Sequence, residues 1–268
     1  MRSLPETSTS GISVLWVGHA TVLIRLGERY VLTDPVFSRT VGMLSPRLVQ
    51  PGLPVHEVPN ITATLVSHTH FDHLSFSSLD ALGTRTGTLL VPRGILEYLP
   101  RFPFPERGIG PWSSIVLDGV TITAVPVAHP GGRYGLDEST CGDCSTGFVL
   151  EHDGWTIYFG GDTAYASARF QETRQRFPHI DLAILPICPI APRDFMRKTH
   201  LSPGEALRAH RDLGARWMMP IHYDTFINSD DAPGDCLKEL HASMRRMGLP
   251  SSEVIELKVG ERRVIPQH

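Results

Sequence analysis

The feature that most constrains this chain is a cluster of metal-competent side chains, H-x-H-x-D-H, that begins at His68. The cluster follows an apolar run, residues 62–67, of the kind that predicts a buried strand. An extended segment places His68, His70 and Asp72 on one side, and a bend within the cluster brings His73 beside Asp72. Imidazole and carboxylate ligands in this arrangement suit two neighbouring zinc ions or similar borderline metals. The alternative is a polar loop whose histidines are merely solvated.

Four further polar side chains each follow a run of residues that predicts a strand. His129 follows VTITAVPVA, Asp162 follows WTIYFGG, His222 follows RWMMPI and Asp34 follows RYVLT. The ends of strands, where a rigid scaffold meets an open edge, commonly carry functional side chains. The residues alone leave structural alternatives open. The two histidines can stabilise loops, and Asp162 can be the N-cap of a helix predicted over 163–177.

The composition narrows the class of protein. Among 268 residues, 25 Lys and Arg against 28 Asp and Glu give a net charge of −3. This balance argues against nucleic acid or an anionic membrane surface as the main partner. No apolar run approaches the about 18 residues that span a bilayer, and the N-terminus lacks the apolar stretch of a secretory signal. We therefore expect a cytoplasmic protein with one domain over residues 1–268.

The pattern along the chain predicts an α/β fold. Short strands are expected at 12–17, 21–26, 29–34, 62–67, 88–92, 114–117, 120–127, 145–152, 155–162, 181–187 and 216–223, with two more near the C-terminus. Helices are expected at 74–83, 163–177 and 236–248, and after a capping box formed by Ser202 and Glu205. Irregular segments are expected at 35–60 and 189–200. Sheet and helix alternate without a polar linker, which favours a four-layer αββα sandwich.

The motifs together resemble those of the metallo-β-lactamase superfamily. H-x-H-x-D-H is followed by a single His, Asp and His at strand ends, in the order of that superfamily. The segments WVGHATVLI, VLTDPVFS, SHTHFDHLS, FGGDTAY, DLAILPI, KTHLSPGEA and PIHYDTF resemble one branch of it. That branch holds enzymes of the N-acylphosphatidylethanolamine phospholipase D type and the L-ascorbate-6-phosphate lactonase type. The resemblance spans roughly residues 12–228 and implies the αββα metallo-β-lactamase fold.

The resemblance also implies a ligand set for two divalent metal ions. It assigns His68, His70 and His129 to one ion, Asp72, His73 and His222 to the other, and Asp162 to both. Zinc is favoured, with manganese or iron as alternatives. Such a centre generates hydroxide from water between the metals, and Asp72 is expected to orient that water.

The resemblance implies two functions, and a third, of a different class, is kept as an alternative. The first is a phosphodiesterase of the phospholipase D type, the second is a lactonase or other cyclic-ester hydrolase, and the third is a non-catalytic metal-binding protein. The substrate is expected to be a small-molecule or lipid ester, and peripheral lipid contact and oligomerisation stay open.

Other residues are assigned by position. His19 and Asp34 are expected to hydrogen-bond metal ligands, and His200 is expected to reach the substrate as a catalytic residue, with helix-entry packing as its alternative. Substrate contacts are expected from Arg133, Arg193, Tyr223 and Asp224. Cys141 and Cys144 form a C-x-x-C, interpreted as reduced thiols on a loop near the site; a disulfide or metal ligation is the alternative.

Overall fold

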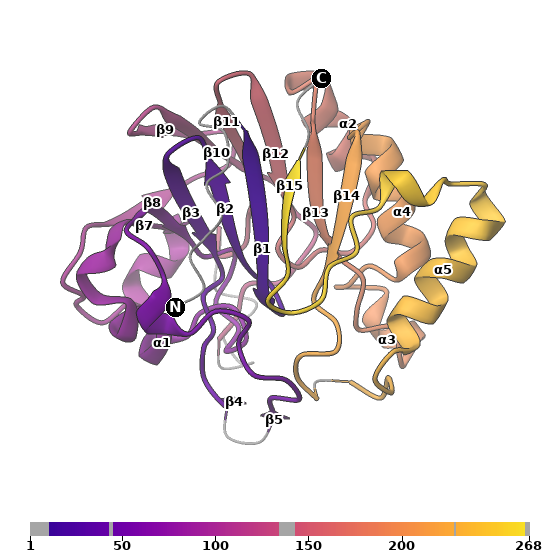
Figure 1. Ribbon diagram of the computed structural model, residues 1–268, viewed down its shortest axis with the longest axis horizontal. Coiled ribbons are helices and arrows are strands. Elements are labelled where there is room, and N and C mark those ends of the chain that lie inside the picture. Colours follow the sequence, from indigo (N-terminus) through magenta and orange to yellow (C-terminus); the bar gives the residue numbers. More distant parts are fainter. Residues whose placement is uncertain (1–10, 43–44, 134–142, 228, 266–268) are drawn as a thin grey trace.

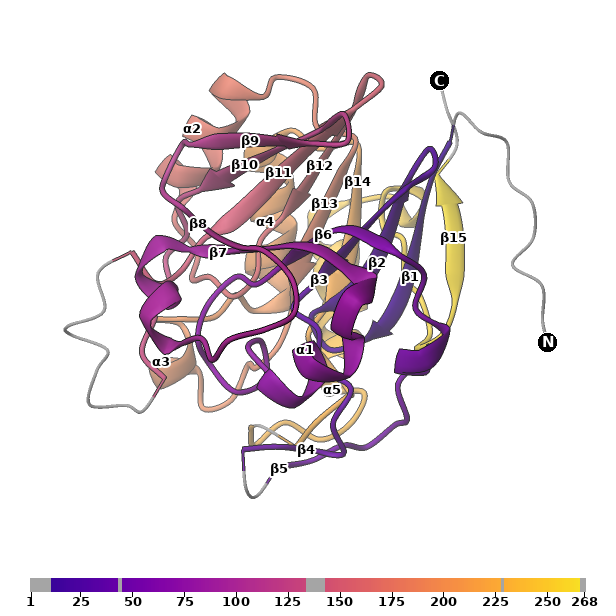
Figure 2. The ribbon, with the colours of Figure 1, turned by 90° about the vertical axis from the view of Figure 1, so that its left-hand side faces the viewer.

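Two β-sheets packed face to face form the centre of the molecule, and helices lie on their outer surfaces (Figure 1 and Figure 2). The structure is a computed structural model that describes residues 11–42, 45–133, 143–227 and 229–265. Its layers are those of the expected αββα sandwich, and the predicted α/β class is confirmed.

The first sheet has seven strands and the second has six. In spatial order the first sheet contains β15 (Arg262–Ile265), β1 (Ile12–Gly18), β2 (Thr21–Leu26), β3 (Arg29–Thr33), β6 (Ile61–Leu65), β7 (Thr86–Pro92) and β8 (Glu106–Ile109). The second contains β14 (Trp217–Ile221), β13 (Leu182–Pro186), β12 (Trp155–Phe159), β11 (Gly147–His152), β10 (Val120–Val125) and β9 (Ser114–Leu117). A separate two-stranded pair consists of β4 (Thr40–Val41) and β5 (Ser45–Pro46).

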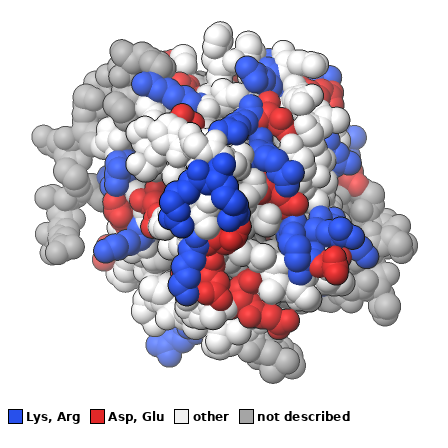
Figure 3. All heavy atoms as spheres, turned by 90° about the vertical axis from the view of Figure 1, so that its right-hand side faces the viewer, with Lys and Arg blue, Asp and Glu red and all other residues white. Residues whose placement is uncertain are grey.

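Helices cover both outer faces. The first sheet carries α1 (Phe76–Leu82), and the second carries α2 (Ser167–Arg176), α4 (Pro203–Leu213) and α5 (Asp235–Met247), with the short α3 (Arg193–Met196) ahead of α4 (Figure 1). The capping box of Ser202 and Glu205 starts α4 as the sequence predicts. Figure 3 shows acidic and basic side chains interspersed on the outer face near α4 and α5, where Arg246 pairs with Glu239. No helix of the described residues has the length and apolar character needed to cross a bilayer.

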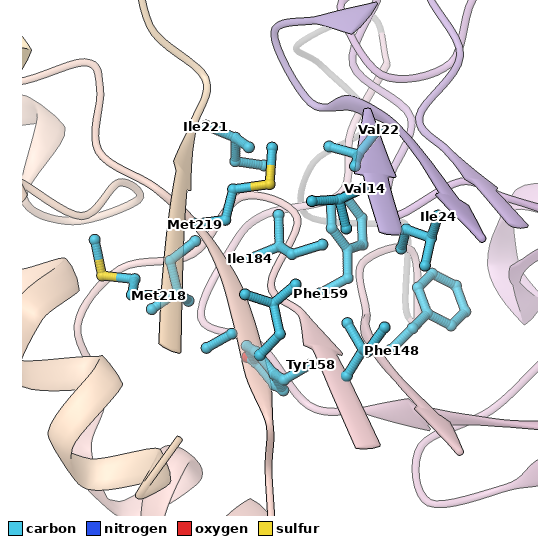
Figure 4. Close-up of a cluster of buried hydrophobic side chains, with 14 of the residues drawn as sticks. Val14, Val22, Ile24, Phe148, Tyr158, Phe159, Ile184, Met218, Met219 and Ile221 are labelled. Carbon is cyan, nitrogen blue, oxygen red and sulfur yellow. The ribbon is translucent and has the colours of Figure 1, made fainter. Parts of the chain in front are cut away.

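The core lies between the sheets. Figure 4 shows Val14, Val22 and Ile24 of the first sheet facing Phe148 and Phe159 of the second, and all five are almost or completely inaccessible to solvent. Burying side chains of this size contributes roughly 1.5–3 kcal/mol each, relative to leaving them exposed. Strands buried along their whole length explain why the sequence shows continuous apolar runs rather than strict alternation.

Two expectations about elements are wrong. The helix expected over 163–177 begins only at Ser167, because the backbone at Ala164 pairs with Ala128 and the Thr163 hydroxyl accepts a hydrogen bond from the Ala128 N–H. The N-cap interpretation of Asp162 is therefore excluded. Near the C-terminus the described residues form one strand, β15, rather than two, and Val254 makes only an isolated bridge.

Candidate metal centre

The residues that follow strands meet at one edge of each sheet, and strand direction explains why. β3 runs parallel to β6, and β12 runs parallel to β13 and β14. β10 runs in the direction of β12 because each pairs antiparallel with β11. The residues just past these carboxyl ends therefore gather along one edge. They are Asp34 and His68 in the first sheet and His129, Asp162 and His222 in the second.

The backbone bends sharply where these strands end. His19, Asp34 and His222 have left-handed φ values of 55°, 35° and 69°. Such values are uncommon outside glycine and often occur at functional sites. Gly161 also has a positive φ, 55°, and a Cβ placed on it would lie 2.5 Å from Ser67 Cβ of the other sheet. Glycine is required at this position, and its absent side chain lets the two sheets approach at the site.

Three imidazoles form the first ligand group. His68 Nε2 lies 2.9 Å from His70 Nδ1, and His129 Nε2 lies 3.2 Å from the same atom. Nitrogen atoms that share a tetrahedral ion at about 2.0–2.1 Å lie roughly 3.3 Å apart. His129 Nδ1 donates to the Thr199 carbonyl over 2.8 Å, which leaves Nε2 of His129 with its lone pair toward the other two rings. The spacing suits one metal ion.

A carboxylate and two imidazoles form the second group. His73 Nε2 lies 3.1 Å from His222 Nε2, and Asp72 Oδ2 lies 3.7 Å and 3.6 Å from these two nitrogens. His19 Nε2 lies 2.9 Å from Asp72 Oδ2, so His19 makes the expected contact with a proposed ligand. This second group consists of the three residues that the resemblance assigns to the second ion.

Asp162 lies between the two groups. Its Oδ2 atom is 3.3 Å from His73 Nε2 and 3.9 Å from His68 Nε2, and its Oδ1 atom is 3.2 Å from His222 Nε2. The side chain is 2% exposed. One buried carboxylate thus faces ligand atoms of both sets.

Asp34 accepts hydrogen bonds on the side of the ligand groups that faces away from the cavity, and it is linked to one histidine of each group. Its Oδ2 atom accepts from His73 Nδ1 over 2.7 Å and from the Ser67 hydroxyl over 2.7 Å, and its Oδ1 accepts from the Ser67 N–H. The Ser67 oxygen in turn lies 3.0 Å from His68 Nδ1. These bonds turn the Nε2 atoms of His68 and His73 inward, as expected for a residue that orients metal ligands.

The electrostatics of the cluster fit a cation. Burial lowers the pKa of His68 well below its usual value and that of His129 to about 3, so these rings are neutral and can bind a metal. Burial opposes protonation of His222, but the Asp162 carboxylate raises the pKa of His222 to about 10. Among the described residues, the buried atoms Asp162 Oδ1, His222 Nδ1 and His200 Nδ1 have no hydrogen-bond partner. A positive charge next to Asp162 would compensate the buried negative charge of its carboxylate.

A cavity of about 500 Å³ opens onto the cluster. Its floor is polar and its walls are largely apolar. It is lined by Val41, Gly42, Ser45, His70, Phe71, Asp72, Asp162, Pro189, Phe195, Met196, His200 and His222. Such a cleft, with few convergent polar groups, is typical of a small-molecule site.

His200 reaches this cavity, whereas Arg193 does not line it. His200 Nδ1 lies 3.5 Å from Asp162 Oδ2, and burial lowers the pKa of His200 to about 4. Arg193 donates to the His200 carbonyl and to the Glu205 carboxylate. These bonds hold the segment that carries His200, and the substrate contact of Arg193 stays a prediction.

Tyr223 and Asp224 also point elsewhere. The Tyr223 ring packs against Trp16 at 4.7 Å between centroids, and its hydroxyl donates to the Leu257 carbonyl. Asp224 Oδ1 accepts from the Gly234 N–H. The left-handed turn at His222 directs the following side chains away from the cavity. Substrate contacts of Tyr223 and Asp224 stay predictions that this cavity does not support.

Arg133 lies beneath the ligand loop rather than in the cavity. Its guanidinium lies 4.3 Å from the ring centroids of both Phe71 and Phe76 and donates to the carbonyls of Thr69 and Leu74. Only 7% of Arg133 is exposed. Arg133 lines a neighbouring cavity of about 540 Å³ instead, and its donors hold the backbone on either side of the H-x-H-x-D-H segment. Its substrate contact stays a prediction.

Some contacts at the site were not predicted. Ser67 joins Asp34 to His68, and the Thr225 hydroxyl accepts from the His19 N–H over 2.8 Å. Both are adjacent in sequence to residues that the motifs single out, and this adjacency is the available signal. Phe195 and Met196 of α3 also line the cavity, in a segment expected to be irregular.

The C-x-x-C pair is described only in part. Cys141 lies outside the described residues. Cys144 is buried and disulfide-bonded, so the interpretation of reduced thiols is wrong for Cys144. Cys144 is therefore not free to bind a metal.

Comparison with known proteins adds independent observations. A family model described as a beta-lactamase superfamily domain matches residues 29–223. An uncharacterized protein of Mycobacterium tuberculosis is 33% identical over 245 residues, which cover 87% of this chain and 64% of that protein. This chain therefore spans less than two thirds of that relative. N-acyl-phosphatidylethanolamine-hydrolyzing phospholipase D 1 of Caenorhabditis elegans is 29% identical over 274 residues, 95% of this chain and 76% of that protein.

Solved structures agree on the fold. The isothiocyanate hydrolase from Delia radicum gut bacteria superposes with a TM-score of 0.74 at 20% identity, covering 94% of this chain and 98% of that one. The family match, the two-sheet architecture and the cluster at its edge lead to one assignment: this chain belongs to the metallo-β-lactamase superfamily. The superfamily predicted from the motifs is confirmed, and it supports the coarse class of a metal-dependent hydrolase.

Proposed function

We propose that this protein is a hydrolase that uses two divalent metal ions to cleave a phosphodiester of the phospholipase D type. The observation that carries the proposal is the position of Asp162. Its buried carboxylate faces His68 and His73 with one oxygen and His222 with the other. A carboxylate between two ligand sets suits a pair of ions, because its charge offsets their mutual repulsion.

In this proposal each ligand set holds one ion. His68, His70 and His129 would hold the first ion, Asp72, His73 and His222 would hold the second, and the Asp162 carboxylate would be shared by the two sets. Zinc is favoured, since the set is imidazole and carboxylate without thiolate, and manganese or iron would also be accepted. Two such ions supply a nucleophilic hydroxide at neutral pH and stabilise negative charge on the substrate.

The remaining chemistry belongs to side chains that line the cavity. Asp72, 19% exposed, keeps an orientation fixed by the hydrogen bond from His19 and can hold the attacking water by a hydrogen bond. His200 is neutral at pH 7, is 16% exposed, and can exchange a proton with the substrate. Arg193 fixes the position of His200 through its carbonyl.

The substrate class is supported by the cavity and by one relative. The walls contributed by Phe71, Phe195 and Met196 suit an apolar substituent, while the polar floor suits an anionic ester. The Caenorhabditis elegans relative is named for hydrolysis of N-acyl-phosphatidylethanolamine, a lipid phosphodiester. We therefore propose a phosphodiester with an apolar group as the substrate.

Metal analysis combined with a substrate screen tests the proposal. Purified protein, reconstituted with excess zinc, should contain two ions at the histidine cluster and should cleave bis(p-nitrophenyl) phosphate or a phospholipid. Chelation should abolish the activity, and zinc should restore it. One ion or fewer at the cluster would contradict the dinuclear centre. Fully loaded protein that opens lactones but ignores every diester would replace the phosphodiesterase with the lactonase.

A further inference from the structure

Two reduced cysteines and a carboxylate lie together outside the histidine cluster. Cys188 follows β13, Cys236 lies in the first turn of α5, and Asp231 precedes that helix. The two Sγ atoms and a carboxylate oxygen lie within 4.8 Å of one another. The two thiols are 5% and 1% exposed.

The spacing between sulfur and oxygen is that of two atoms bound to one ion. Cys188 Sγ donates to Asp231 Oδ2 over 3.6 Å. A thiolate at about 2.3 Å and a carboxylate oxygen at about 2.0–2.2 Å from a tetrahedral zinc ion lie roughly 3.5 Å apart. The separation of these two atoms therefore matches that of two ligand atoms on one ion, which would replace the thiol proton.

The carboxylate is held in place by its neighbours. Asp231 Oδ2 accepts from the Ile190 N–H over 2.7 Å and from the Ser229 hydroxyl over 2.9 Å, and Oδ1 accepts from the Ala191 N–H over 3.1 Å. Metal-binding carboxylates are commonly oriented in this way. A separate cavity of about 130 Å³, lined by Cys188, Asp231 and Cys236, has room for a water molecule as a further ligand.

We propose that Cys188, Cys236 and Asp231 form a second metal site, which takes one thiophilic divalent ion such as zinc or cadmium. Binding releases the two thiol protons to solvent and forms two metal–sulfur bonds and one metal–oxygen bond. The ion would join the end of β13 to the start of α5. Because soft thiolates prefer softer metals than imidazole and carboxylate do, this site should differ from the histidine cluster in metal preference.

Cobalt(II) titration of the full chain tests the site. Chelator-treated protein is kept without reductant, because Cys188 and Cys236 are already free whereas Cys144 is disulfide-bonded. With excess cobalt(II) chloride it should show a sulfur-to-cobalt charge-transfer band, which imidazole and carboxylate ligands do not produce. Cys188→Ser and Cys236→Ser should each lose the band and bind one cobalt ion fewer per chain. Ser229 donates a hydrogen bond to Asp231 but is not one of the proposed ligands, so the Ser229→Ala variant should keep the band. His222→Ala should also keep it, since His222 belongs to the other cluster.

Absence of the band in wild-type protein would overturn the proposal, as would its loss only in His222→Ala. If the serine variants do not fold, the wild-type chain gives the answer by alkylation. Saturating zinc should slow reaction of Cys188 and Cys236 with iodoacetamide by about tenfold or more, and a chelator should restore it. Equal rates with and without zinc, or a Cys188–Cys236 disulfide whose reduction yields no metal binding, would show a thiol pair instead of a metal site.

Discussion

Two groups of histidines in this chain differ in their surroundings. Seven of the 13 gather at the carboxyl-end edge of the two sheets, where five are buried and His70 and His200 are half-buried: His19, His68, His70, His73, His129, His200 and His222. His56 and His241 lie on the outer surface, and each pairs with one exposed carboxylate. His241 and Glu256, for example, are 47% and 41% exposed and lie 2.7 Å apart.

The difference shows what burial does to the same side chain. An exposed imidazole beside one carboxylate needs nothing further, because water solvates both partners. Several buried imidazoles whose ring nitrogens face one another need a shared proton or a metal ion between them, because water does not reach them. Loss of an exposed ion pair should therefore change the free energy of unfolding little. Loss of one residue of the edge cluster should affect the whole cluster.

The largest expected effect comes from Asp162→Asn. The amide keeps the size of the side chain but removes the charge that faces both ligand sets. We expect metal affinity or turnover to fall by at least about 10–100-fold, since even groups that only orient ligands cost that much. Metal content by elemental analysis and turnover of a diester measure the change. If the variant has the metal content and turnover of the wild type, Asp162 is not a metal ligand. The edge cluster would then tolerate substitution as the surface pairs do.

Asp34→Asn should have the next largest effect. Asp34 binds no metal in our proposal, but it orients His73 directly and His68 through Ser67. We expect roughly tenfold weaker metal binding, at the lower end of the range for such residues. Zinc competition with a chromophoric chelator measures the affinity. Unchanged affinity in folded protein would mean that the imidazoles hold their orientation without this carboxylate.

A smaller effect, on stability, is expected for Arg133→Lys. The substitution keeps the charge but loses the planar group between Phe71 and Phe76 and some of the bonds to the carbonyls of Thr69 and Leu74. Leaving a buried carbonyl unsatisfied costs about 1–3 kcal/mol. Urea unfolding of the zinc-loaded protein reports the loss. A variant as stable as wild type, but with raised KM for the diester, would identify Arg133 as a substrate contact.

The smallest effect is expected for His241→Gln on the outer surface. Both partners of this ion pair are exposed, so unfolding free energy should change by less than about 0.5 kcal/mol and metal content should not change. Urea unfolding and elemental analysis of this variant are the matched control for the three above. A loss of metal in His241→Gln would show that the two groups of histidines are not independent.

The parts of the fold and site that the sequence predicts are those tied to strands. Apolar runs locate the strands, and His129, Asp162 and His222 follow them directly, so strand direction alone brings them to one edge. Being next to a ligand in the sequence does not determine where a side chain points once the strand has ended. Tyr223 follows a proposed ligand, yet the left-handed turn at His222 sends its ring into the core. The helix expected from residue 163 starts late because tertiary pairing with Ala128 competes with helical bonds.

Contacts between distant residues carry no local pattern. Cys188 and Asp231 are 43 positions apart, and nothing in the sequence indicates that they meet. The Arg133 guanidinium likewise binds a loop that lies more than fifty residues earlier. A single domain over residues 1–268 and a cytoplasmic location stay predictions.

The close approach at Gly161 has a consequence for how such a centre can evolve. Each sheet carries its own share of the proposed ligands, so the width of the centre is the gap between two stiff bodies. Gly161 contacts Ser67 of the other sheet, and the two sheets can approach this closely because Gly161 has no Cβ atom. A larger residue at position 161 would remove no proposed ligand, but its side chain would push the two sheets apart. The distance between the two proposed ligand sets thus depends on residues where the sheets meet, and it can change without the substitution of any histidine.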